Sequence, residues 1–207
     1  MRIALYRHFA IRAILLVAVL AALGLLAIGI GFRGDAEVEV ARLTEALDLE
    51  PGITVAEIGA GDGWLTVEVA NQLGAAGHVF STELSEGRRA AIEQAVVDAS
   101  LANVTVVAAG EDNANLAADC CDAIFMRRVY HHLSDAAAIN KTLYAALKPS
   151  GTLAVIEFTS DGWLGRVTGM GITPARLESE LVQAGFEHVE TNDWPGAYHY
   201  IAVFTRP

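Results

Sequence analysis

The chain has 207 residues, of which 53% are hydrophobic, and its 14 Lys and Arg against 25 Asp and Glu give a net charge of −11. This length and composition allow one domain of ordinary size with an appendage, and they exclude intrinsic disorder and a small disulfide-built domain. The acidic balance argues against a nucleic-acid-binding protein, which would carry a basic face.

The first 33 residues differ from the rest of the chain. They carry four arginines and no acidic residue, so they contribute +4 and the remaining 174 residues sum to −15. Residues 13–32 are twenty consecutive uncharged residues, enough for a helix that crosses roughly 30 Å of bilayer core. We therefore expect 1–33 to be an N-terminal membrane anchor with a transmembrane helix over 13–32. A cleaved signal peptide is the alternative, although its apolar region is usually about 7–15 residues long.

Residues 34–207 are expected to form one domain in which short apolar strands alternate with helices. The first helix is capped by Asp35, places Leu43 and Leu47 on one face, and ends before Pro51. The expected strands are 53–58, 78–82, 104–108, 122–126 and 153–158, with helices from Leu65 to Leu73 and over 86–100 and 135–147 between them. A last helix, capped by Thr173, ends near Gly185, and the strands 187–191 and 200–205 follow without an intervening helix. The pattern predicts an α/β fold with an open, doubly wound, mostly parallel sheet of seven strands and an antiparallel hairpin at its edge.

A glycine cluster follows the first strand. Gly59, Gly61 and Gly63 let the backbone approach a ligand closely at the start of the next helix. A tight structural turn is the alternative explanation for these glycines. In such sheets, ligands bind at the carboxyl ends of the strands near the point where the strand order reverses.

Acidic residues accompany the glycines at the strand ends. Glu57 precedes the turn, and Glu83 ends the second strand, where a carboxylate can accept hydrogen bonds from both hydroxyls of a ribose. Glu111 and Asp112 end the third strand, where they could hold the edge of an adenine. Asp122 opens the fourth strand. An acid-lined pocket suits a cationic ligand better than a pyrophosphate.

The glycine spacing separates two kinds of nucleotide cofactor. The dinucleotide fingerprint is G-x-G-x-x-G/A, and its third small residue would fall here on Trp64, which is too large for close packing of helix on strand. A nucleotide-dependent oxidoreductase is therefore disfavoured. The observed G-x-G-x-G preceded by an acid resembles the first motif of class I S-adenosylmethionine-dependent methyltransferases.

This resemblance covers nearly all of residues 36–207. LEPGITVAEIGAGDGWLTVEVA is similar to the family's opening strand, loop and helix, and LYAALKPSGTLAVIEF resembles its fifth-strand signature, with Ser150 where a second glycine is common. More narrowly, the sequence resembles bacterial methyltransferases that act on small molecules. The resemblance implies S-adenosylmethionine as cofactor, bound by Glu57, Gly59, Ala60, Gly61, Glu83, Glu111 and Asp112.

Two adjacent histidines follow the fourth strand. His131 and His132 are our candidates for the catalytic position, because a histidine beside the transferred methyl could accept a proton from a hydroxyl or amine acceptor. The alternative is that one of them braces the helix that begins near Ser134. The neighbouring Arg127 and Arg128 could meet an acidic substrate, or could form a solvated pair.

Two further segments have less specific interpretations. The glycine-rich segment 159–172 carries Trp163, Arg166 and Met170 and is either a substrate lid or a plain surface loop. Cys120 and Cys121 are adjacent, so we expect no ordinary disulfide, and no Cys/His spacing indicates a metal site.

The sequence thus predicts a membrane-anchored methyltransferase that acts on a small or lipophilic acceptor, with no nucleic-acid partner and no feature that calls for an obligate protein partner. The arginines flanking residues 13–32 give only a slight bias toward an N-terminus on the cytoplasmic side, an orientation that would place the domain outside the cytoplasm. We expect the domain on the cytoplasmic side, where S-adenosylmethionine is made, with the exported side as the alternative. The alternative function is a catalytically degenerate binding protein with the same fold.

Overall fold

The computed structural model describes residues 37–161, 167, 170–194 and 199–207. The chain divides into two units, Met1–Glu39 and Val40–Pro207, and the second contains all seven strands of the sheet. The membrane span expected over 13–32 and the helix cap expected at Asp35 lie outside the described residues. Within the described ranges, no helix is long and apolar enough to cross a membrane.

Strands and helices alternate along the chain as expected. After a helix that ends at residue 47, the elements are β1 (Thr54–Ile58), α2 (Trp64–Leu73), β2 (His78–Glu83), α3 (Glu86–Asp98), β3 (Val104–Ala108), β4 (Cys121–Arg127), a 3-10 turn (Tyr130–His132), α4 (Ala136–Ala146), β5 (Leu147–Phe158), α6 (Pro174–Gln183), β6 (Glu187–Asp193) and β7 (His199–Thr205). The cap expected at Thr173 is confirmed, because its side chain accepts a hydrogen bond from the Arg176 N–H. Asp135 caps α4 in the same way by accepting one from the Ala138 N–H.

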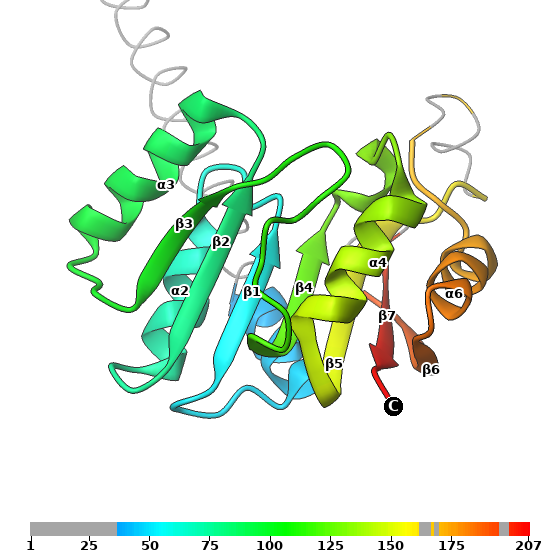
Figure 1. Cartoon of the computed structure of the whole chain (residues 1–207), viewed down its shortest axis with the longest axis horizontal. Helices are drawn as coiled ribbons and strands as arrows, with labels where there is room; N and C mark the ends of the chain where they lie inside the picture. Colours follow the sequence, from blue (N-terminus) through cyan, green and yellow to red (C-terminus); the bar gives the residue numbers. More distant parts are fainter. Residues whose placement is uncertain (1–36, 162–166, 168–169, 195–198) are drawn as a thin grey trace, which may run out of the picture. The chain divides into compact units, whose positions relative to one another are not determined.

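The seven strands form one sheet in the order β3-β2-β1-β4-β5-β7-β6 (Figure 1). Strands β1 to β5 are parallel, whereas β7 is antiparallel to both β5 and β6. The expected mostly parallel sheet with a terminal hairpin is therefore confirmed. The strand order reverses between β1 and β4, so the carboxyl ends of these two strands flank the position where ligands bind in such sheets.

Each face of the sheet carries its own hydrophobic core. On one face Leu65, Val69 and Leu73 of α2 pack with Phe125, while Ile139 and Leu143 of α4 join Met126 in the core of the other face. Because Phe125 and Met126 are consecutive in β4, their side chains point to opposite faces, and both are fully buried. Two-sided burial explains why β4 is apolar from Ala123 to Met126 rather than alternating in polarity.

The beginning of β5 differs from the sequence-based prediction. We expected a helix through Leu147 and a strand from residue 153, but α4 ends at Ala146 and Leu147 is already paired with Cys121 in the sheet. The pairing of β4 with β5 then shifts register between Cys121 and Ala123. This irregularity accommodates Pro149 and Ser150. Ser150 has a φ of +65°, in the left-handed region that favours glycine.

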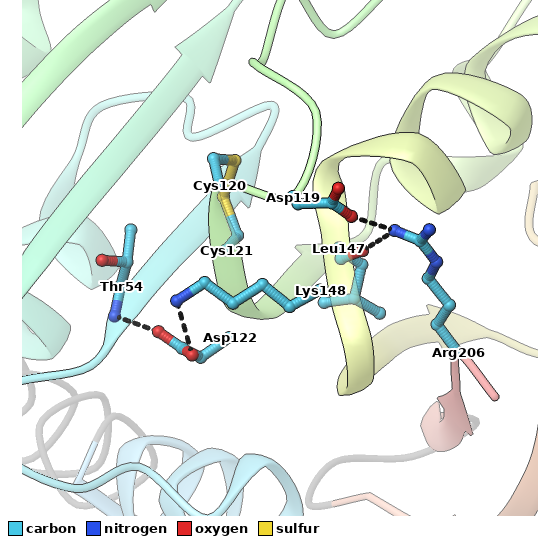
Figure 2. The surroundings of a disulfide bond; sticks show 8 residues. All are labelled: Thr54, Asp119, Cys120, Cys121, Asp122, Leu147, Lys148 and Arg206. Atoms are coloured by element: carbon cyan, nitrogen blue, oxygen red, sulfur yellow. Dashed lines mark hydrogen bonds and ion pairs between the residues drawn. A yellow bond between two sulfur atoms is a disulfide. The ribbon is translucent and has the colours of Figure 1, made fainter.

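The prediction that Cys120 and Cys121 form no disulfide was wrong. Figure 2 shows the two residues joined by a disulfide at the amino end of β4. Their Cα atoms are 3.7 Å apart, below the usual range of about 4.4–6.8 Å, which is why adjacency argued against the bond. The preceding Asp119 has a positive φ of 51°, so the chain turns sharply just before the pair.

Asp122 also lies at the amino end of β4 and therefore far from the carboxyl edge of the sheet. Its carboxylate accepts hydrogen bonds from the Thr54 N–H and from Lys148 Nζ, both at 2.8 Å (Figure 2). These contacts tie the starts of β1, β4 and β5 together. Asp122 thus has a structural role and does not join the acids at the other end of the strands.

Candidate functional site

A cavity of about 650 Å³ opens at the carboxyl ends of β1, β2 and β4. This volume lies within the roughly 300–1,000 Å³ typical of small-molecule sites. Of the residues predicted from the sequence, the cavity is lined by Glu57, Gly59, Ala60, Gly61, Glu83, Glu111 and His132. The fold therefore brings together residues from three strand ends and from the turn that follows β4.

The glycine loop between β1 and α2 has a conformation that glycine favours. Gly59, Gly61 and Gly63 all have positive φ, of 70°, 65° and 81°. The N–H groups of Gly59 and Ala60 donate to the Thr82 carbonyl at 2.9 and 3.0 Å, which holds the loop against the end of β2.

The three glycines differ in what surrounds them. A Cβ on Gly59 would lie 2.7 Å from Val129 Cγ2, and one on Gly63 would lie 3.1 Å from the Ile92 Cα, so these two are required by packing. A Cβ on Gly61 would meet no atom within 4 Å, and Gly61 lines the cavity. Packing therefore does not explain Gly61, whose missing side chain leaves room for a ligand.

Glu83 ends β2 with its carboxylate at the cavity. It is only 6% exposed, and its oxygens accept hydrogen bonds from the N–H groups of Gly61 and Ser85, both at 3.0 Å. A carboxylate offers about four lone-pair positions, so these two bonds orient it and leave acceptor capacity for a ligand. This geometry fits the expected binding of two ribose hydroxyls.

Glu57 is the most deeply buried acid of the cavity, at 4% exposure. Its carboxyl accepts a hydrogen bond from the Thr66 hydroxyl, which itself lies 2.8 Å from the Ser81 hydroxyl. Burial raises the pKa of Glu57 to about 8, while the Thr66 bond and the charge of Arg127 act against this rise. Without a ligand the group is mostly protonated at pH 7, and a cation placed beside it would favour its ionised form.

This shift predicts a pH-dependent stability. Because the folded state holds the Glu57 proton up to about pH 8 and the unfolded state only to about 4.5, the group stabilises the fold at low pH and this contribution is lost as pH rises. Between pH 6 and 8 the loss is about 2 kcal/mol, or roughly 5 °C in Tm. Thermal unfolding of the unbound protein at both pH values, compared with Glu57→Gln, isolates this effect. An equal change in Tm between pH 6 and pH 8 for the two proteins would contradict the raised pKa of Glu57.

The two acids after β3 are placed differently from one another. Glu111 lines the cavity, whereas Asp112 does not, and both are exposed. The Gly110 N–H donates to the Asn113 carbonyl at 2.7 Å, which turns the loop back at this point. Glu111 is thus the acid positioned to meet the far end of a ligand whose ribose lies at Glu83.

The two histidines after β4 are also separated by the fold. His132 is exposed and lines the cavity, while the side chain of His131 is only 7% exposed and does not line it. His131 Nδ1 lies 2.8 Å from Glu157 Oε2, the His131 N–H donates to the same oxygen at 3.2 Å, and the two imidazole ring centres are 3.9 Å apart. His131 therefore braces the turn that presents His132.

Glu157 is a residue of this region that the sequence analysis missed. It is fully buried in β5, and its carboxylate contacts both the ring and the backbone of His131. The available signal was an acid within the apolar strand sequence LAVIEF. A buried carboxylate requires partners, and those partners lie next to the cavity.

Half of the segment 159–172, for which a substrate lid and a plain surface loop were both considered, lies outside the described residues, including Trp163 and Arg166. At its end, the Ile172 N–H donates to the Phe158 carbonyl at 3.0 Å. Across the described ranges, no cluster of three or more His, Cys, Asp or Glu could hold a metal ion.

Solved structures share this fold. An S-adenosylmethionine-dependent methyltransferase from Aquifex aeolicus superimposes with a TM-score of 0.75 at 21% identity over 82% of this chain and 90% of its own. A second one, from Mesorhizobium loti, gives 0.67 at 18% identity, covering 80% and 96% of the two chains. The [4+2]-cyclase SpnF gives 0.72 at 17% identity, covering 81% and 79%. At these identities the likeness establishes the fold alone.

The sequence comparison adds the family. No curated protein matches the sequence, but the family model described as a methyltransferase domain matches residues 56–155. This stretch runs from β1 into β5 and contains the glycine loop, Glu83, Glu111 and His132. The chain therefore carries, over residues 56–155, a segment similar to methyltransferase domains, on a fold that it shares with S-adenosylmethionine-dependent methyltransferases.

Proposed function

We propose that this protein transfers a methyl group from S-adenosylmethionine to a small or lipophilic acceptor while anchored to a membrane through residues 13–32. The observation that carries the proposal is Gly61, whose positive φ and empty surroundings leave room for a ligand between two acids. The bound cofactor supplies an already activated methyl group. The protein's own task is therefore to bind, to align and to exclude water.

The acids match the polar parts of the cofactor. Glu83, held by the Gly61 and Ser85 N–H groups, would accept the ribose hydroxyls, and Glu111, which unlike Asp112 lines the cavity, would hold the adenine edge. Glu57 would face the cationic amino-acid end. Because burial raises the Glu57 pKa to about 8, placing a cation there would release its proton and strengthen the attraction.

His132 is the proposed proton acceptor. It lines the cavity from the turn after β4, and it is backed by the buried pair of His131 and Glu157. A neutral imidazole in this position could take the proton that a hydroxyl or amine acceptor loses when it is methylated. In this assignment His131 and Glu157 act through His132 and are positioning residues.

The connections beside the cavity bear on the size of the acceptor. Residues 109–120 between β3 and β4 and 128–135 between β4 and α4 are short connections, without an inserted domain for a macromolecule. A small acceptor fits such a site, and an anchor over 13–32 would favour a lipophilic one.

The test is calorimetric titration of the full-length chain in detergent micelles with S-adenosylmethionine and S-adenosylhomocysteine. We expect micromolar binding of both. A folded chain that binds neither compound would contradict the proposal and favour the alternative of a degenerate binding protein.

The side of the membrane can be tested separately. We propose the cytoplasmic side because the cofactor is made there, yet the Cys120–Cys121 disulfide favours the exported side, since cytosolic thiols are kept reduced. A C-terminal reporter active only outside the cytoplasm, together with thiol trapping in intact cells, measures both properties. An exported, oxidised domain would contradict the cytoplasmic assignment and favour the binding-protein alternative.

A further inference from the structure

The cavity has two sides of opposite charge. Its acids lie on the side of β1, β2 and β3, and they are Glu57, Asp62, Glu83 and Glu111. On the side of β4 the lining residues are Arg127 and Arg128, followed by Val129 and His132. The one cation on the acidic side, Arg88, is exposed on α3. The cationic groups of the cofactor account for the acids, whereas the arginines of β4 suit a carboxylate, either the cofactor's own or one carried by the acceptor.

These two arginines are unusual in so acidic a domain. Residues 34–207 carry −15, with only ten of the 14 Lys and Arg, so two consecutive arginines in one cavity are not part of a general basic surface.

The arginine side chains are also held in place by aromatic rings. The Arg127 guanidinium carbon lies 5.4 Å from the centre of the Trp64 ring, and that of Arg128 lies 5.1 Å from the Phe158 ring. An arginine over a ring retains its charge and loses part of its freedom before any ligand arrives. Such preorganisation favours the binding of an anion.

The backbone at Arg128 is unusual as well. Its φ is +58°, in the left-handed region, and its N–H donates to the Ile156 carbonyl at 2.7 Å. This conformation is unfavourable for a non-glycine residue, and such strain is concentrated at functional sites. It turns the chain out of β4 so that Val129 reaches Gly59 and His132 reaches the cavity.

We propose that the β4 side of the cavity is a subsite for an oxyanion carried by the methyl acceptor, such as a carboxylate, with Arg128 as its main contact. The proposal rests on the proposed function, because the acceptor must bind beside the cofactor. A carboxylate could also come from the cofactor's own amino-acid end. Arg127 lies closer to that end, because its guanidinium packs on Trp64 directly after the glycine loop, whereas Arg128 lies against Phe158 of β5. The acceptor is therefore assigned to Arg128.

The experiment uses the full-length chain in detergent micelles, saturated with S-adenosylhomocysteine. Ligand-observed NMR titrations compare three probes of similar size and different charge: benzoate, benzyl alcohol and benzylammonium. We expect benzoate to bind at least about 10-fold more tightly than the other two, and Arg128→Gln to remove this preference while Arg128→Lys retains part of it. Lys141→Gln, which makes the same charge change on the exposed surface of α4, should keep the preference.

The outcomes separate this proposal from the one on which it rests. Normal S-adenosylhomocysteine binding with no preference for benzoate, or with a preference that survives Arg128→Gln, would overturn the oxyanion subsite and leave methyl transfer standing. A 10-fold loss of S-adenosylhomocysteine affinity in Arg128→Gln would assign the arginine to the cofactor's carboxylate and would also overturn it. If S-adenosylhomocysteine fails to bind the folded wild-type chain, both proposals fall.

Discussion

Replacing Gly61 by valine is expected to abolish binding of S-adenosylmethionine while leaving the domain folded. No atom lies within 4 Å of the position that a Cβ would take, so the protein itself can accommodate the side chain. The space belongs to the cavity, however, and the Gly61 N–H must keep its bond to Glu83. A branched side chain there would occupy the ligand's volume and disturb the loop. We expect at least a 100-fold loss of affinity by calorimetry.

The backbone strain of this substitution needs its own control, because valine is disfavoured at the Gly61 φ of +65°. Gly74, at the end of α2, has the same φ and also no atom within 4 Å of a Cβ, but it does not line this cavity. Gly74→Val should therefore lower Tm at least as much as Gly61→Val and leave cofactor affinity unchanged. If Gly61→Val bound the cofactor normally, the glycine loop would be only a turn.

The fold could be predicted because strands buried on both faces leave a strong pattern. The apolar runs at β1 and β4, separated by amphipathic segments such as α2, give the element order and hence a mostly parallel sheet. The order reversal that creates the cavity follows from the same topology. The beginning of β5 escaped prediction because Pro149 and the positive φ of Ser150 are accommodated by a register shift, which has no signal in local propensity.

The site was predictable wherever function depends on a strand end. Gly61 follows β1 and Glu83 ends β2, so the sheet topology alone brings them together. In the structure the Gly61 N–H donates a hydrogen bond to the Glu83 carboxylate. The roles of His131 and His132 could not be separated, because burial of one ring against Glu157 depends on a strand 26 residues away in the sequence. The disulfide was missed for a similar reason, since the turn at Asp119 that accompanies it is a backbone property.

Removing the Glu83 carboxylate is expected to weaken cofactor binding by about 1.5–3 kcal/mol, or roughly 10- to 100-fold in Kd. In Glu83→Ala the ribose hydroxyls would lose their acceptor, and the Gly61 N–H would lose the bond that fixes the loop. Glu83→Gln should have an intermediate Kd. Its amide oxygen can still accept a hydrogen bond, but its NH₂ group would face a backbone N–H, which is also a donor. Calorimetric titration with S-adenosylhomocysteine measures all three proteins.

The design separates a direct role of Glu83 from a general effect of charge or stability. Glu93→Ala makes the same charge change on the exposed surface of α3 and should leave Kd unchanged. In Glu83→Ala the N–H groups of Gly61 and Ser85 lose their acceptor, but they can donate to water instead, in the cavity and at the surface. The unfolding free energy should therefore fall by only about 1 kcal/mol. An unchanged Kd in Glu83→Ala would remove Glu83 from the cofactor site. An equal loss in Glu93→Ala would show that net charge, rather than a hydrogen bond to the ribose, governs the affinity.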